Sequence, residues 1–572
     1  MCLCLICTAN LQIERTLCTQ RTSASQLKKA LMPSLAHQLR RTLRRALWLA
    51  ATSVLLATHA SHVNAIPTQI PGDFDTSFAG GQGAISSLII SGNGIDYLTA
   101  MALQPDGKMV LAGYCDGLNS QDFCVARING DGSLDTTFIG PLGNGGGKVV
   151  LDVGGNTDSA SAVAIQPDGK IILAGSCYNG ANTDFCIVRL NPNGSLDATF
   201  GGPGGGGNGM FLLPIGLSND YATAMALQPN GKIVLVGNCI VNSQSDFCAA
   251  QLNPDGSFDT SFVGSTGTGA GKIAFPMGLS HDYATAVALQ PDGMIVIAGY
   301  CVSAMVDFDF CVTRLDSAGV FDVTFDGPGG SSNGKFLLPI SSSNDILSAL
   351  LIQPDGKIVL AGSCLVGVAN NDFCAARLLP DGSFDATFDG PTGAGNGRIL
   401  LPITLNKADT ATAMAIQPDG KILIAGYCDG GGIQYFCVTR LHIDGTLDVS
   451  FDGPSGVGDG KFLIPLGGVS TAMALQPDGK IVLAGACNNG NTSHFCVARL
   501  YGGPFGYKNC TMDIDGDGKV LPTTDGLLLT RISLGITGNA ALAGASSPTA
   551  TRNTWPKVRD YLVNQCGMLV AP

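Results

Sequence analysis

The chain has 572 residues, a net charge of −12 and only 13% charged residues, together with 78 glycines. This composition is typical of short strands and turns, and it excludes a chain built mainly from long helices. The negative charge lies after position 65, where 24 Lys and Arg face 43 Asp. An acidic body of this kind disfavours nucleic acids and anionic membrane surfaces as partners.

Residues 1–65 have the pattern of an export signal. Four arginines between positions 40 and 45 precede an apolar run at 46–57, and small residues lead to a cleavage site after Ala65. The apolar run is too short to span a bilayer permanently, so we expect no transmembrane span once the signal is removed. Met32 is an alternative start. The sequence therefore predicts an exported protein that is secreted, held at the cell surface or periplasmic.

Residues 66–505 contain seven copies of one unit, which start 59 to 64 residues apart. In the copy at 411–428, ATAMAIQPDGKILIAGYC, an alternating run leads through a Pro-Asp-Gly turn into a second apolar run. A variable loop, a third strand such as DFCVARL, an LDTTF-like corner and a fourth strand follow. Four antiparallel strands repeated seven times predict an all-β fold, a seven-bladed β-propeller. A solenoid is the alternative, but it would need capping repeats.

The two ends of the repeat region are offset. The first corner, at 74–78, precedes the first Pro-Asp-Gly turn, and the last repeat has only three strands. We therefore expect the N-terminal segment 83–90 to pair with the last repeat and close the propeller, which would remove two exposed sheet edges.

Every copy carries two cysteines nine or ten residues apart, at the end of the second strand and the start of the third. Cross-strand placement brings their β-carbons within bonding distance, and exported proteins meet an oxidising compartment. Metal binding by paired thiolates is the rival, but no repeated histidine completes a tetrahedral site. We predict one disulfide per blade: Cys115–Cys124, Cys177–Cys186, Cys239–Cys248, Cys301–Cys311, Cys364–Cys374, Cys428–Cys437 and Cys487–Cys496.

The repeat resembles a known family. The stretch at 161–200, in which SAVAIQPDGKIILAG is followed by FCIVRLNPNGSLDATF, is similar to the delta-60 repeat of bacterial exported proteins. The resemblance covers about residues 71–500. It implies a propeller fold and carries no agreed biochemical activity.

Six of the seven repeats have an aspartate in the turn before the first strand, which we expect on the same face as the cysteine-bounded loops. Carboxylates around a propeller mouth could bind cations or polar ligands, and tyrosines beside them offer stacking surfaces. The alternative is that each aspartate accepts bonds from amides of its own turn. The residues are Asp96, Asp158, Asp220, Asp282, Asp345 and Asp409, with Tyr97, Tyr221 and Tyr283.

Two other features bear on chemistry. The recurring corner at 131–135, Asp-Gly-Ser-x-Asp, has too few oxygen ligands for calcium and is interpreted as a turn. The loops between paired cysteines differ from repeat to repeat, as in DGLNSQD and VSAMVDFDF. Variation on a fixed scaffold favours a specific binding surface.

We therefore predict a non-catalytic binding or surface-interaction protein, whose partner is an extracellular glycan or an envelope protein. A polysaccharide hydrolase or lyase is the alternative. It would need two aspartates with raised pKa values in a channel-facing cleft, because the region after residue 65 has no glutamate. A purely structural envelope component is the third interpretation.

Residues 506–572 leave the repeat pattern and predict a small α-helical, EF-hand-like module that binds Ca²⁺. Asp513, Asp515 and Asp517 alternate as in the first half of an EF-hand loop. The Lys519 carbonyl would be the next ligand, and Asp525 closes the loop one residue later than usual.

This segment resembles one calcium repeat of a dockerin, over about 25 residues. A second calcium repeat is missing, since residues 536–553 contain no aspartate, so the resemblance leaves cohesin binding, the role of dockerins, an open question for this chain. Apolar residues at 527–534 and 555–562 are spaced for two helices. Cys510 and Cys566 are expected to join the ends of the module, because small domains need such links.

Overall fold

The computed structural model describes residues 71–502 apart from short loop segments, and it describes 514–515, 523–533, 536, 538–547 and 550–562. The gaps in the first range are 92–93, 118–119, 142, 144–145, 204–206, 266, 268–269, 304–306, 330–332, 368–369, 392–394, 452, 454–458 and 490–491. The predicted export signal, Cys510, Asp513, Asp517, Lys519 and Cys566 lie outside the described residues. Within these ranges, no helix has the length and apolar character needed to cross a membrane.

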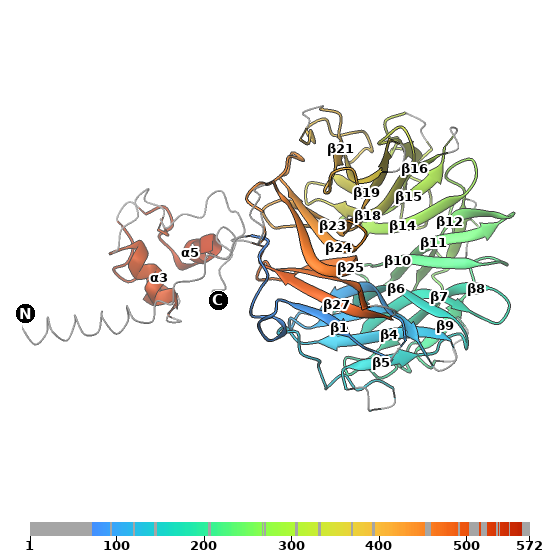
Figure 1. Cartoon of the computed structure of the whole chain (residues 1–572), viewed down its shortest axis with the longest axis horizontal. Coiled ribbons are helices and arrows are strands. Elements are labelled where there is room, and N and C mark those ends of the chain that lie inside the picture. The colour runs from blue at the N-terminus through green and yellow to red at the C-terminus, as the bar shows by residue number, and fades with distance from the viewer. Residues whose placement is uncertain are drawn as a thin grey trace, which may run out of the picture. The chain divides into compact units, whose positions relative to one another are not determined.

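The described part of residues 71–502 is all-β, apart from one short 3₁₀ turn, and forms seven repeated four-stranded blades, as predicted (Figure 1). In the first blade, β2 (Asp96–Leu103), β3 (Met109–Asp116), β4 (Gln121–Ile128) and β5 (Lys148–Leu151) pair antiparallel in chain order. The second and third blades are β6 (Asp158–Ile165), β7 (Ile171–Tyr178), β8 (Thr183–Leu190), β9 (Met210–Leu213), β10 (Asp220–Leu227), β11 (Ile233–Val241), β12 (Gln244–Leu252) and β13 (Lys272–Phe275). The fourth and fifth are β14 (Asp282–Leu289), β15 (Ile295–Val302), β16 (Phe308–Leu315), β17 (Lys335–Leu338), β18 (Asp345–Ile352), β19 (Ile358–Val366), β20 (Asn370–Leu378) and β21 (Arg398–Leu401).

The last two blades share a strand. β22 (Asp409–Ile416), β23 (Ile422–Asp429) and β24 (Gln434–Leu441) pair with the first half of β25 (Lys461–Leu475). The second half of β25 pairs with β26 (Ile481–Asn489), and β27 (Thr492–Leu500) follows. A short 3₁₀ turn, η1 (Ala79–Gly81), precedes β1 (Ala84–Leu88).

The N-terminal strand completes the seventh blade, as predicted. β1 pairs antiparallel with β27, and Figure 1 shows β1 in blue beside β27 in orange. The predicted closure is shown only as far as this strand pairing: among the described residues the sheets do not join into one continuous hydrogen-bonded ring, because the first five blades are separate sheets. The first and last blades instead meet through side chains: the Thr471 hydroxyl donates to the Leu98 carbonyl at 2.8 Å. Equivalent hydroxyls at 99, 161, 223, 285, 348 and 412 link each blade to the next.

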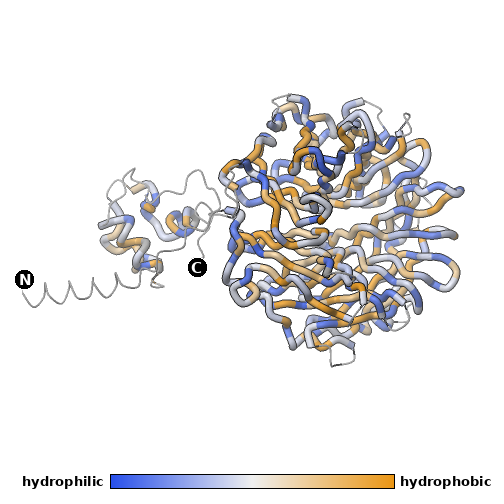
Figure 2. The backbone as a smooth tube through the Cα atoms, viewed as in Figure 1, coloured by the Kyte–Doolittle hydropathy of each residue, from blue (hydrophilic) through white to orange (hydrophobic). Residues whose placement is uncertain are grey.

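The hydrophobic core lies between neighbouring blades. The second and third strands of each blade are almost wholly buried because both of their faces are covered, whereas the first strands are only partly buried. Figure 2 shows the hydrophobic residues concentrated along the strands and hydrophilic residues in the loops. Gly113 illustrates how closely the first two strands approach, since a β-carbon there would lie 2.0 Å from the Tyr97 carbonyl oxygen.

A buried arginine holds the corner of six repeats. Arg377 Nε donates to Asp385 Oδ2 at 2.8 Å, its Nη1 donates to the Ile443 carbonyl of the next blade, and its guanidinium lies over Phe388. The third repeat has Gln251 in this place. The corner at 131–135 is a turn, as interpreted, because one aspartate caps its own turn and the other pairs with the arginine.

The described residues after 513 include three helices, α3 (Asp525–Ser533), α4 (Asn539–Leu542) and α5 (Trp555–Asp560). Their apolar residues form a buried cluster that includes Ile514, Leu528 and Val558. Of these helices, α3 and α5 overlap the two apolar segments at 527–534 and 555–562, whereas the predicted EF-hand-like module as a whole stays a prediction.

Candidate functional site

The two cysteines of each repeat are bonded in all seven blades, as predicted, with Cα–Cα distances of 5.7 to 5.9 Å. The second cysteine lies opposite a glycine that recurs in the second strand of every repeat, as in Gly237–Cys248. Each disulfide therefore closes a short hairpin of variable sequence, here called a cysteine hairpin. The predicted Cys510–Cys566 bond lies outside the described residues.

The cysteine hairpins share one face with the turns that precede the first strands, here called lead-in turns. The Thr183 amide donates to Asn219 Oδ1 at 3.0 Å, and the Ser245 amide donates to His281 Nδ1 at 3.1 Å. The Phe308 amide donates to Asn344 Oδ1 in the same way. Each bond joins the hairpin of one blade to the lead-in turn of the next. We call the surface formed by both sets of loops the hairpin face.

The six aspartates at the start of the first strands are wholly buried. Asp158 Oδ2 accepts bonds from the Val153 and Gly154 amides at 2.7 and 2.8 Å. The others bond the amides of their own lead-in turns in the same manner: Asp96, Asp220, Asp282, Asp345 and Asp409. This geometry favours the turn-stabilising alternative for these carboxylates.

A second set of buried aspartates was not predicted. It lies on the third strands immediately before Phe-Cys, and it comprises Asp122, Asp184, Asp246, Asp309 and Asp372. Burial raises the pKa of Asp246 to about 6, and the negative charge of Asp282 is the second cause. Burial, followed by the charges of Asp307 and Asp345, raises the pKa of Asp309 to about 6. Carboxylates of adjacent blades therefore face each other across five blade junctions.

The last junction differs, because His494 takes the place of the third-strand aspartate. Its Nδ1 lies 3.7 Å from Asp96 Oδ2. The recurring Asp-Phe-Cys in five repeats is the sequence signal that could have revealed this second set.

The predicted tyrosines lie on the hairpin face with their rings partly exposed. Tyr97 stacks on Tyr114 with ring centroids 5.3 Å apart, and Tyr283 stacks on Tyr300 at 5.0 Å. Burial is the main cause that raises the pKa of Tyr97 to about 12, and electrostatic repulsion from Tyr114 and Tyr427 adds to it. Tyr221 keeps 38% of its surface exposed.

A pocket of about 680 Å³ opens where the sixth and seventh blades meet. At this junction the lead-in turn is missing, since β25 runs unbroken and Gly468 pairs with Cys487 in the position that an aspartate holds elsewhere. The space is lined by Tyr427, Asp429, Ile433, Gln434 and Asn488, among others. The shortest repeat therefore leaves a cavity on the hairpin face.

In the C-terminal segment only Asp515 and Asp525 of the predicted calcium ligands lie within the described residues. Asp525 Oδ1 accepts bonds from the amides of Ile514 and Asp515 at 2.6 and 3.1 Å. Asp515 Oδ2 accepts a bond from the Ser547 amide. Both carboxylates are buried, which brings the predicted closing residue next to the predicted loop.

The repeats match one family model, described as a domain of unknown function (DUF5122) beta-propeller. The matched segments are residues 104–138, 166–200, 228–262, 290–325, 353–388, 417–451 and 476–500. Each runs from the Pro-Asp-Gly turn, which is Pro-Asn-Gly in the third repeat, to the corner, except that the seventh ends at β27. The match supports a repeat β-propeller and names no activity.

None of the curated proteins matches the sequence. Among solved structures, a polysaccharide lyase of family PL25, an ulvan lyase, is 12% identical over 73% of this chain and 96% of that chain, with a TM-score of 0.42. Sqt1 of Chaetomium thermophilum is 14% identical over 70% and 82% of the two chains, with a TM-score of 0.38. Drosophila Plexin A in complex with Semaphorin 1b is 10% identical over 76% and 88%, with a TM-score of 0.36. At these scores the likeness carries no argument about activity.

Proposed function

We propose that this protein is an exported, non-catalytic binding protein whose ligand lies on the hairpin face. The observation that carries the proposal is the pocket between the sixth and seventh blades, which exists because one lead-in turn is absent. The seven disulfides fit an oxidising compartment outside the cytoplasm. They also hold the variable loops on a rigid base, which favours recognition.

The lining of the pocket indicates a glycan as the ligand. Tyr427 offers an aromatic ring, and the side chain of Ile433 is 58% exposed beside it. Asp429, Gln434 and Asn488 add carboxylate and amide groups that can pair with hydroxyls. Pockets that combine an apolar surface with a few convergent polar groups suit small ligands whose orientation is fixed by hydrogen bonds. An envelope protein is the other partner that the test includes.

Calcium binding by the C-terminal segment is part of the same proposal. Asp513, Asp515, Asp517, the Lys519 carbonyl and Asp525 would supply the oxygen ligands. The approach of Asp525 to the backbone at 514–515 supports it. Calorimetry on the full chain should detect a calcium site that Asp515→Ala removes; an unchanged stoichiometry in this variant would refute the site.

A polysaccharide hydrolase or lyase is a second candidate, because one observation favours it. Asp122 and Asp158 lie close together and burial raises the pKa of both, as a carboxylate pair of this type requires. Against it, both side chains are buried and Asp158 is bonded to its own turn. Turnover of a polysaccharide that stops in Asp122→Asn would establish the enzyme.

The test of the binding proposal is a screen of the full exported chain against glycans and envelope proteins, with calcium and with chelator. We expect a glycan to bind, and Tyr427→Ala to weaken binding at least tenfold. Tyr221→Ala is the matched control, since it removes a tyrosine from the same face in another repeat. Equal losses in both variants, or no binding by the wild type, would overturn the assignment of the pocket. Binding in neither condition would favour a purely structural role.

A further inference from the structure

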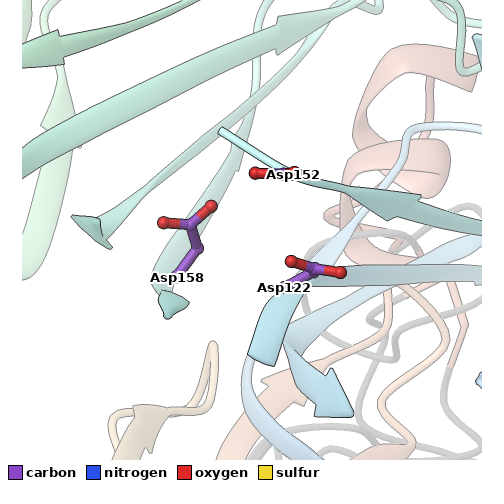
Figure 3. Close-up of side chains that lie close together, drawn as sticks. All are labelled: Asp122, Asp152 and Asp158. Atoms are coloured by element: carbon purple, nitrogen blue, oxygen red, sulfur yellow. The ribbon is translucent and has the colours of Figure 1, made fainter. Parts of the chain in front are cut away.

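Three aspartates meet at the junction of the first and second blades. Asp122 lies on β4, Asp158 begins β6 and Asp152 follows the end of β5. Each brings one carboxylate oxygen to within 4.8 Å of the other two, and Figure 3 shows the three carboxylates around a common space. Oxygens bound to one Ca²⁺ lie about 2.3–2.6 Å from the ion, hence up to about 5 Å from each other. The spacing suits a single cation.

One oxygen of this cluster lacks a hydrogen-bond partner within the described part of the chain. Asp158 is wholly buried, and its Oδ1 is unpaired although its Oδ2 accepts two amide bonds. Asp122 is only 7% exposed, whereas Asp152 is exposed. A buried carboxylate oxygen without a partner is unfavourable. A cation bound to the cluster would satisfy it.

The other four carboxylate pairs show what distinguishes this cluster, which is its composition and not the unpaired oxygen alone, since Asp220 Oδ1 and Asp246 Oδ1 also lack a partner among the described residues. At each of those four junctions, the first of the two blades has a proline at the position of Asp152. The second blade has a lysine or an arginine at the start of its fourth strand. At the Asp184–Asp220 junction, for example, Lys272 Nζ donates to the Pro214 carbonyl at 2.6 Å and its charge acts on Asp220. The prolines are Pro214, Pro276, Pro339 and Pro402, and the basic residues are Lys272, Lys335, Arg398 and Lys461.

At the junction of the first and second blades, the residues at both of these positions make the cluster more negative. Asp152 replaces the proline, and Met210 replaces the basic residue at the start of β9. The cluster therefore gains a third carboxylate and loses the positive side chain that its counterparts have. This arrangement favours a positive charge supplied from outside the chain.

The cluster is accessible from solvent. It borders a cavity of about 470 Å³ on the hairpin face, whose lining includes Ser91, Asp116, Ser120 and Asp152. Water in the cavity can complete a coordination shell. Ca²⁺ accepts six to eight oxygen ligands in flexible geometry, whereas Mg²⁺ demands a near-ideal octahedron, so an open cluster of three carboxylates favours Ca²⁺.

We propose that Asp122, Asp152 and Asp158 bind a divalent cation, preferentially Ca²⁺, between the first two blades. This site is separate from the predicted calcium loop at 513–525. The ion would tie the first cysteine hairpin to the second lead-in turn, and thereby stiffen part of the hairpin face.

The experiment is calorimetric titration of the metal-free full chain with CaCl₂, in the Asp515→Ala background so that the C-terminal loop does not contribute. We expect one Ca²⁺ per chain, and at least tenfold weaker binding after Asp152→Asn or after Asp152→Pro. The proline variant reproduces the residue found in the other blades, and circular dichroism of both variants reports whether the fold is kept. No Ca²⁺ binding in the Asp515→Ala background would overturn the proposal, as would undiminished binding in both Asp152 variants.

A gain of binding provides the matched control. In the same Asp515→Ala background, Pro214→Asp together with Lys272→Met gives the Asp184–Asp220 junction the same composition, and should raise the stoichiometry from one to two Ca²⁺ per chain. Lys272→Met alone should not. The two calcium sites can be told apart. If only the C-terminal site is absent, the wild type and Asp515→Ala will both bind one Ca²⁺ per chain.

Discussion

The buried arginine of the fifth repeat offers a quantitative test of how the blades are held together. Arg377 is only 2% exposed and donates hydrogen bonds to three partners. Its Nε donates to Asp385 Oδ2 at 2.8 Å, its Nη2 donates to Thr387 Oγ1 at 3.0 Å, and its Nη1 donates to the Ile443 carbonyl of the sixth blade. Arg377→Gln would therefore leave the buried Asp385 without its main counter-charge and cut a link between blades.

The expected loss can be bounded from the contacts that remain. Breaking a buried ion pair by removing one partner costs about 3–5 kcal/mol. Lys357 Nζ stays 3.1 Å from the same Asp385 oxygen, which places the loss at the lower end, about 3 kcal/mol. The third repeat shows that a lysine can supply part of the missing counter-charge. There Gln251 replaces the arginine, and Lys232 Nζ lies 2.6 Å from Asp259 Oδ2.

The assay is guanidinium unfolding of the oxidised full chain, followed by far-UV circular dichroism. Arg377→Gln should lower the unfolding free energy by about 3 kcal/mol, and Arg377→Gln with Asp385→Asn should recover about 1–2 kcal/mol of it, because the uncompensated charge is gone. Gln251→Arg is the control for substitution at this position and should change stability by less than about 1 kcal/mol. A loss below about 1 kcal/mol in Arg377→Gln, or no recovery in the double variant, would refute the reasoning.

Two further predictions concern the cysteines and the aspartates. Replacing Cys239 and Cys248 by serine should cost about 2–3 kcal/mol in the same unfolding assay, because the disulfide closes a loop of nine residues; an unchanged midpoint would contradict this. The metal-free protein should be most stable at about pH 4. As the pH falls from 7 to about 4, Asp246 and Asp309, with folded pKa values raised to about 6, bind protons more tightly than in the unfolded chain, so stability rises. Below about pH 4 it falls, because residues such as Asp135, whose pKa is lowered to about 2, must be protonated. Thermal unfolding from pH 3 to 8 measures this, and Asp246→Asn should flatten the rise; a steady increase of stability up to pH 8 would contradict it.

The fold follows from local patterns that the sequence carries openly. Alternating apolar runs, Pro-Asp-Gly or Pro-Asn-Gly turns and paired cysteines recur every 59 to 64 residues, so the strands, the hairpins and the disulfides are all predictable from one copy. The pairing of β1 with β27 was also predictable, because the offset between the first corner and the last repeat leaves one strand missing at one end and one spare at the other.

The candidate site was only partly predictable, since it depends on contacts between blades. The aspartates before the first strands are visible in the sequence, but their burial against their own turns is decided by packing. Asp122 meets Asp158 across a junction that no local pattern describes. The pocket beside Tyr427 had a signal in the spacing of 59 residues, the shortest of the repeats, yet its cause, the lost lead-in turn, emerges only when β25 runs unbroken.

The most direct test of the central claim is hydrogen exchange on the full chain with and without the ligand found by the screen. If the hairpin face binds the ligand, amides at 429–434 and around Asn488 should exchange more slowly in the complex. The loops at the opposite ends of the blades, such as residues 201–203 and 207–209, should be unchanged. Protection of those loops, with none at 429–434, would contradict the account.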